Sequence, residues 1–252
     1  MKRKFVGSQM RILVIFSTIF VIFPGLIGKR SFGQLPEQAL FMSAGQSTKK
    51  IALKYLALGD SYTIGEAVPA SDRYPMQLVH LLRSGGMMID DPEIIATTGW
   101  TTDDLLSGIK NYPFHSPYDL VTLLIGVNNE YQGKSLTDYE SGFRMLLKKG
   151  IELAGGNSSH VIVLSIPDYA YTPFAKESDT KAISFAIDNF NLVNKKIATE
   201  MLCGWLDVTM ESRKVKGDGS LLASDGLHYS GKEYAIWAKN LLPLVQAALH
   251  LA

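Results

Sequence analysis

The chain has 252 residues, of which 46% are hydrophobic, 19% charged and 10% aromatic, which excludes a disordered chain, a collagen and a small disulfide-stapled protein. The net charge of +1 hides a split, because the first thirty residues carry six bases and no acid. The remainder has 19 bases against 24 acids, and an acidic body without clustered Lys and Arg argues against a nucleic-acid partner.

An apolar run at residues 12–27 follows a basic amino-terminal head. A membrane-spanning helix needs about twenty apolar residues and the hydrophobic part of a secretory signal about seven to fifteen, so this run lies between the two. Pro24 and Gly25 break its far end, and a small-x-small cleavage site ends at Gly33. We expect residues 1–33 to be an export signal that sends the protein to the periplasm or outside the cell. An uncleaved amino-terminal membrane anchor is the alternative, and any membrane association would then depend on this segment alone.

Residues 34–50 are polar and mixed, and we expect a linker there, followed by a single domain over residues 51–252. The domain contains five short, almost continuously apolar runs, at residues 51–58, 94–97, 120–125, 161–166 and 205–208. Such runs are typical of strands that are covered on both faces, as in a parallel sheet.

Helical patterns lie between and after these runs, at residues 75–82, 137–151, 183–201 and 230–245. Thr137 and Glu140 form a capping box for the second of them, and Ser230 to Glu233 form the start of the last. Pro243 is expected to kink or divide the last helix. Alternation of strands and helices predicts an α/β sandwich, in which ligands bind beyond the carboxyl ends of the strands.

Polar and glycine-containing segments follow three of the runs, and a fourth precedes the last helix: 59–62 (GDSY), 98–101 (TGWT), 126–129 (GVNN) and 225–228 (DGLH). Each segment alone is a common turn or loop. Their joint placement at strand ends and in a facing loop indicates one site.

The residue types in these segments suit nucleophilic catalysis. A serine hydroxyl needs a base, usually histidine, and an aspartate on the other imidazole nitrogen holds the required tautomer. Ser61 is the candidate nucleophile, His228 the base and Asp225 its partner. The backbone amides of Ser61 and Gly99 and the side-chain amide of Asn128 are the candidate oxyanion donors.

The four segments resemble the SGNH or GDSL family of esterases and lipases, whose four marker residues would be Ser61, Gly99, Asn128 and His228. The resemblance implies a three-layer α/β/α sandwich with five parallel strands, of the flavodoxin-like type, and ester hydrolysis without metal or cofactor. Two residues depart from the family pattern: Asn129 stands where Asp is common, and Tyr229 where Pro often follows the histidine. Neither change removes a catalytic group. Tyr229 is expected to reshape the acyl or leaving-group pocket, so it bears on the substrate rather than on the mechanism.

Other classes fit the sequence less well. The Gly-x-Ser-x-Gly string of α/β-hydrolases is absent, and six residues rather than four separate Gly126 from Gly133 in the nearest match to a phosphate-binding loop. The five histidines show no metal-ligand spacing, and the single cysteine, Cys203, is expected to be structural. A binding module with an inactive site on the same fold is the non-enzymatic alternative.

The sequence is compatible with several classes of ester substrate. Seven aromatic residues lie in the loops that we expect on the active face, namely Tyr62, Trp100, Tyr131, Tyr169, Tyr171, Phe174 and Tyr229. Aromatic walls suit acyl chains and sugar faces alike. Export favours small-molecule, lipid or glycan esters outside the cytoplasm, such as lysophospholipids or O-acetylated glycans.

Overall fold

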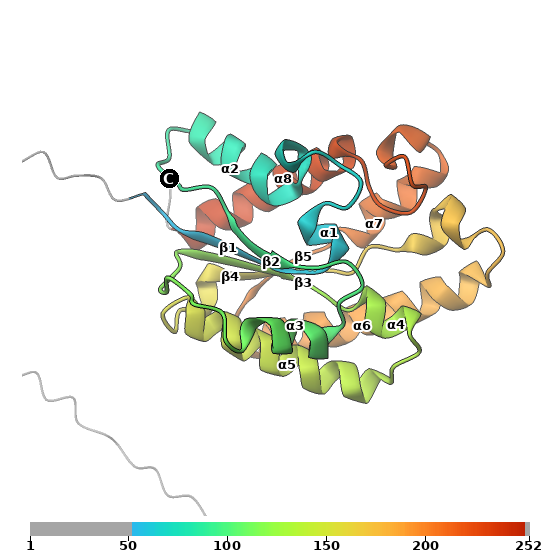
Figure 1. Cartoon of the computed structure of the whole chain (residues 1–252), viewed down its shortest axis with the longest axis horizontal. Helices are drawn as coiled ribbons and strands as arrows, with labels where there is room; N and C mark the ends of the chain where they lie inside the picture. Colours follow the sequence, from blue (N-terminus) through green and yellow to red (C-terminus); the bar gives the residue numbers. More distant parts are fainter. Residues whose placement is uncertain (1–51, 250–252) are drawn as a thin grey trace, which may run out of the picture. The chain divides into compact units, whose positions relative to one another are not determined.

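Five short parallel strands form one sheet at the centre of the protein (Figure 1). The structure is a computed structural model that describes residues 52–249. The export signal or anchor expected at residues 1–33 and the linker expected at 34–50 lie outside the described residues.

The strands are β1 (Tyr55–Gly59), β2 (Glu93–Ala96), β3 (Leu120–Leu124), β4 (Val161–Leu164) and β5 (Gly204–Leu206). Their order across the sheet is β2-β1-β3-β4-β5, the flavodoxin-like order. Every residue of β1, β3 and β4 is buried, which explains why their sequences are continuously apolar rather than alternating. Leu56 of β1 lies opposite Val121 of β3, so these two strands end at the same level.

Helices cover both faces of the sheet, with α2 (Tyr74–Ser84) and α8 (Gly231–Ala248) on one face and α3 (Thr102–Ile109), α5 (Leu136–Leu153) and α6 (Thr180–Glu200) on the other (Figure 1). The four predicted helices bury the apolar faces that their spacing indicates; in α8, the residues Tyr234, Trp237 and Leu241 are fully buried. Helix α3 was not predicted from the sequence. The prediction of a three-layer α/β/α sandwich with five parallel strands is therefore confirmed.

Three short helices follow strand ends: α1 (Ser61–Ile64) after β1, α4 (Val127–Tyr131) after β3 and α7 (Thr209–Ser212) after β5. Because all five strands are parallel, these helices lie at the same edge of the sheet. This edge is the one at which the sequence places the candidate catalytic residues.

Three local expectations were wrong. The first strand begins at Tyr55 rather than at 51. The cap of α5 is Ser135, whose hydroxyl accepts the Asp138 amide at 3.1 Å, so the capping box was placed two residues too late. Of the two outcomes expected at Pro243, a kink or a division of the helix, the division is wrong, because α8 continues through Pro243 with the fully buried Leu241 and Val245 on either side. No helix within residues 52–249 is both long and apolar enough to cross a bilayer.

Gly126 makes the turn from β3 into α4 possible. Its φ of +131° is a conformation that side chains rarely adopt. A Cβ at this position would lie 2.5 Å from the Tyr139 ring and 2.7 Å from Ile166, so there is no room for one.

Replacement Gly126→Ala should lower the free energy of unfolding by about 2–5 kcal/mol, because it combines backbone strain with overpacking. Chemical denaturation measures the change. Gly219→Ala is the control, since a methyl group at Gly219 would meet no atom of residues 52–249 within 4 Å and the φ there is not positive; it should alter stability by less than about 0.5 kcal/mol. Equal losses in the two variants would contradict the role of Gly126.

Candidate active site

Ser61 lies at the carboxyl end of β1, in the sharp turn that begins α1. The Asp60 side chain caps this helix by accepting the Tyr62 amide at 3.1 Å. The backbone carbonyl of Asp60 accepts the amides of Thr63 and Ile64, both at 3.0 Å. The turn therefore fixes the backbone of Ser61, and its side chain faces a cavity.

The two other candidate oxyanion donors come from neighbouring strand ends. Gly99 follows β2 in a loop and has a φ of +84°, and a Cβ there would meet no described atom within 4 Å. Asn128 lies in α4, and its Nδ2 donates a hydrogen bond to the Trp100 carbonyl at 2.9 Å. This bond joins α4 to the loop of Gly99 and leaves the second hydrogen of the amide for another acceptor.

His228 and Asp225 are joined in one loop before α8. The Asp225 Oδ2 lies 2.6 Å from Nδ1 of the imidazole, and its Oδ1 accepts the amides of His228 at 2.9 Å and Leu227 at 3.0 Å. Burial by itself would raise the pKa of Asp225, but the hydrogen bonds from His228 and from these amides lower the pKa overall. The aspartate is therefore ionised at neutral pH and holds the ring by Nδ1.

One cavity of about 150 Å³ brings these segments together: Ser61, Gly99, Asn128 and His228 all line it. The Tyr62 ring contacts the His228 ring edge to face, with 5.6 Å between the centroids. Within residues 52–249 the Ser61 hydroxyl forms no hydrogen bond with the imidazole. Such contacts are often long in unliganded sites and tighten when the substrate binds.

Four of the seven expected aromatic residues line the cavity, namely Tyr62, Tyr131, Tyr169 and Phe174. Trp100, Tyr171 and Tyr229 do not. Tyr229 is fully buried behind Tyr62, with 5.6 Å between their ring centroids, so the expectation that it shapes the pocket directly is wrong. The chain turns into the core directly after His228, which takes the Tyr229 side chain away from the cavity.

Asn129, the other departure from the family pattern, is a structural residue. It is fully buried; its Nδ2 donates to the Thr102 hydroxyl at 2.8 Å and its Oδ1 accepts the Thr102 amide at 3.0 Å. An amide can donate and accept at once, whereas a carboxylate only accepts. Asn129 thus joins α4 to the start of α3 and is turned away from the cavity.

Cys203 takes no part in this site. It is half-buried at the edge of the core, and burial raises the pKa of its thiol to about 12. A thiol in that environment is a poor nucleophile.

Two further kinds of residue at the cavity were not predicted from the sequence. Val127, Leu227 and Thr98 line it, and these residue types do not by themselves indicate a site. Glu130 supports the cavity from behind, because its carboxylate accepts a hydrogen bond from the Tyr169 hydroxyl at 2.9 Å. The two residues are 39 positions apart in the sequence, so no local pattern indicates this contact.

The parallel α/β sandwich thus places Ser61, Gly99, Asn128 and the Asp225-paired His228 around one cavity at the carboxyl edge of its sheet. A family model described as the GDSL-like lipase/acylhydrolase family matches residues 57–236. The chain belongs to this family and is an ester-hydrolysing enzyme.

Solved structures share the fold at low sequence identity. TesA is 16% identical with a TM-score of 0.59, over 77% of this chain and 99% of that one. The acetylxylan esterase Axe2 from Geobacillus stearothermophilus is 22% identical with a TM-score of 0.59, over 78% and 96%. The lipase/acylhydrolase from Enterococcus faecalis is 20% identical with a TM-score of 0.58, over 77% and 96%. No curated protein sequence is significantly similar to this chain.

Asp60 is a fully buried acid beside Ser61. Its Oδ2 has no hydrogen-bond partner among the described residues. Burial raises the pKa of Asp60 to about 7, although the bond from the Tyr62 amide offsets part of this effect. The folded protein therefore keeps a proton on Asp60 at pH values at which the unfolded chain, with an ordinary aspartate pKa of about 4, has released it.

The free energy of unfolding should consequently fall as the pH rises from about 4 to about 7, because the folded state binds more protons than the unfolded state in this window. Asp60→Asn keeps a capping oxygen but does not titrate, so its stability should fall less over the same range. Urea denaturation of both proteins across this range measures the difference. Parallel pH dependences would show that Asp60 is not the group responsible.

Proposed function

We propose that the protein hydrolyses carboxylic esters with Ser61 as nucleophile, His228 as general base and Asp225 as the residue that orients the base. The observation that carries the proposal is the cavity shared by Ser61 and His228, together with the 2.6 Å contact between Asp225 and Nδ1. With Nδ1 held by the aspartate, Nε2 is the nitrogen left to accept a proton.

The reaction runs in two halves. His228 takes the Ser61 proton as the hydroxyl oxygen attacks the ester carbonyl, and the oxyanion that forms is held by the amides of Ser61, Gly99 and Asn128. The intermediate collapses, and the protonated imidazole gives its proton to the departing alcohol. Water then repeats the sequence on the acyl-enzyme, which releases the carboxylic acid and restores the serine.

The cavity favours a short acyl group. A cavity of about 150 Å³ is comparable in volume to one that holds a benzene molecule, which suits an acetyl or another short acyl group held inside it. At its rim the Tyr131 and Phe174 side chains are 60% and 48% exposed, with 6.0 Å between their centroids. Exposed aromatic faces of this kind suit a sugar ring.

The charges near the cavity favour a neutral alcohol. Among residues 52–249 no Lys or Arg lines the cavity, and Glu130 lies directly behind Tyr169. An anionic group such as the phosphate of a lysophospholipid would find no lining cation there, and the Glu130 carboxylate behind Tyr169 would repel it. O-acetylated carbohydrates are therefore the proposed substrate class, and the export signal predicted over residues 1–33 would bring the enzyme to glycans outside the cytoplasm.

Ser61→Ala and His228→Ala should each lower turnover by about 10⁴- to 10⁶-fold, and the double variant should lose little more, since the two residues act as a unit. Nitrophenyl acetate hydrolysis measures the loss. A fluorophosphonate probe should label the wild type at Ser61 and leave Ser61→Ala unlabelled. Activity above a tenth of wild type in Ser61→Ala would refute the assignment, and an unlabelled, inactive wild type would favour a binding module.

A series of nitrophenyl esters should show a preference for acetate, with kcat/KM falling by about tenfold or more from acetate to decanoate, because only a short acyl group fits wholly inside the cavity. Acetylated xylo-oligosaccharides and a lysophospholipid are the two natural comparisons. Faster hydrolysis of the lysophospholipid than of the acetylated sugar would overturn the substrate assignment and leave the serine mechanism intact.

A further inference from the structure

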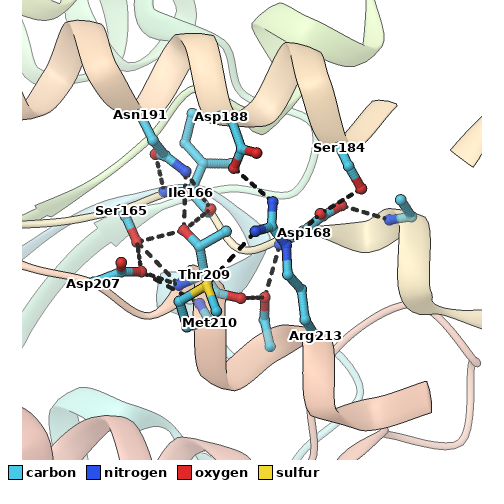
Figure 2. Close-up of polar contacts among 12 residues, drawn as sticks. Ser165, Ile166, Asp168, Ser184, Asp188, Asn191, Asp207, Thr209, Met210 and Arg213 are labelled. Atoms are coloured by element: carbon cyan, nitrogen blue, oxygen red, sulfur yellow. Dashed lines mark hydrogen bonds and ion pairs between the residues drawn. The ribbon is translucent and has the colours of Figure 1, made fainter. Parts of the chain in front are cut away.

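A buried ion pair lies behind the wall of the cavity. Asp168 is fully buried, and its Oδ2 accepts a hydrogen bond from Arg213 Nε at 2.9 Å and another from the Ser184 hydroxyl at 2.7 Å. The guanidinium also donates to Asp188 at 2.6 Å. Figure 2 shows Arg213 reaching from its own helical turn between Asp168 and Asp188.

The chain before Asp168 is held firmly. Asn191 of α6 pairs with the backbone of Ile166, accepting its amide at 2.7 Å and donating to its carbonyl at 2.9 Å (Figure 2). The Thr209 hydroxyl donates to the same carbonyl at 2.9 Å. Asp168 itself donates its amide to the Ser212 hydroxyl at 2.9 Å. The ion pair therefore has a rigid base at the end of β4.

One branch leads from Asp168 to the cavity wall. Its Oδ1 accepts the Ala170 amide at 3.0 Å and so caps the short 3₁₀ helix Tyr169–Tyr171. Tyr169 of this helix lines the cavity, and the next turn carries Phe174, which contacts Tyr169 with 6.2 Å between the ring centroids. The position of the aromatic wall thus depends on the Asp168 carboxylate.

A second branch leads to the catalytic loop. The Asp168 carbonyl accepts a hydrogen bond from the buried Tyr229 hydroxyl at 3.3 Å, and Tyr229 is the residue after His228. The Phe174 amide donates to the Gly226 carbonyl at 3.2 Å, between Asp225 and His228. The wall and the histidine are therefore attached to the same segment.

The charge of Arg213 is what allows a carboxylate at this place. Asp168 has no exposed surface, so without the cation it would be a buried charge held only by neutral donors. The segment would then shift toward water, or the Asp168 carboxylate would take up a proton. In either case the aromatic wall and the His228 loop, both bonded to this segment, would move with it.

On the basis of the proposed ester hydrolysis, we propose that Asp168 and Arg213 are positioning residues that set both the acyl selectivity of the cavity and the placement of His228. Neither residue lines the cavity. They act through Tyr169 and Phe174 on one side and through Tyr229 on the other.

The test compares Arg213→Met with Arg144→Met. Arg144 likewise bridges two carboxylates, those of Glu140 on α5 and Glu200 on α6, but it is more exposed than Arg213 and lies away from the cavity. Both variants are first checked for folding by circular dichroism, and kcat and KM are then measured on nitrophenyl acetate and hexanoate. Arg213→Met should lose about 10- to 100-fold in kcat/KM on acetate, since a displacement of about 1 Å in such sites has that effect. Its acetate-to-hexanoate ratio should change by at least about threefold, whereas Arg144→Met should stay within about twofold on both measures.

Tyr229→Phe separates the two branches by removing one hydroxyl. It should lower kcat on acetate by about three- to tenfold with the acetate-to-hexanoate ratio unchanged, because only the link to the His228 loop is lost. Where Arg213→Met does not fold, Arg213→Lys keeps the charge but not the fork that reaches both aspartates, and it should shift the acyl ratio in the same direction.

A folded Arg213 variant with the kinetics of Arg144→Met would overturn the proposal, as would a Tyr229→Phe variant identical to wild type. Failure of the underlying function would look different. In that case the wild type would not be labelled by the fluorophosphonate probe at all, whereas a labelled and active wild type with insensitive variants would refute only the positioning role.

Discussion

Parallel pairing of β1 with its neighbours is the constraint on which the site depends. Because β2, β1 and β3 run in the same direction and in register, their carboxyl ends deliver Ser61, Gly99 and Asn128 to one edge of the sheet. No one of these residues is close to another in the sequence. The loop before α8 completes the site from a fourth position, since α8 packs on the same sheet and begins at this edge (Figure 1).

Polar groups are buried around this edge at a cost that the packed core has to offset. The acid at 60 lies beside the nucleophile with one oxygen unpartnered among the described residues, and the Asp168 carboxylate lies behind the wall with a full set of donors. Burial of a carboxylate is unfavourable unless it is neutralised or paired. The protein uses both solutions within one site, a raised pKa for Asp60 and an ion pair for Asp168.

Size and charge together define what the cavity can accept. The cavity has three separate properties: a small volume, aromatic faces at the rim, and no lining cation among residues 52–249. In the proposed function each property bears on a different part of the ester: the volume on the acyl group, the aromatic faces on a sugar ring, and the absence of a lining cation on the charge of the alcohol. The combination is narrower than the family as a whole, whose fold carries many activities. The proposed substrate class therefore depends on the walls of the cavity and not on the proposed catalytic groups.

The sequence by itself indicated the sheet, the helices α2, α5, α6 and α8 and the four segments of the site, but not helix α3. Continuous apolar runs indicate strands that are buried on both faces. Glycine, serine, asparagine and histidine placed near the ends of such runs indicate a site at the strand ends. Both patterns are local, so they can be recognised in the sequence. Helix starts were less certain, as the cap at Ser135 shows, because several polar residues near a helix end can serve as the cap.

Only the tertiary structure decided which aromatic side chains face the cavity and what supports them. Tyr62 and Tyr229 have the same type and both flank a candidate catalytic residue, yet one lines the cavity and the other is buried behind it. Asn129 and Arg213 gain their roles from partners 27 and 45 residues away. A local pattern records how a residue relates to its own helix or strand, whereas these roles depend on how separate elements pack against one another, and that is set by the fold as a whole.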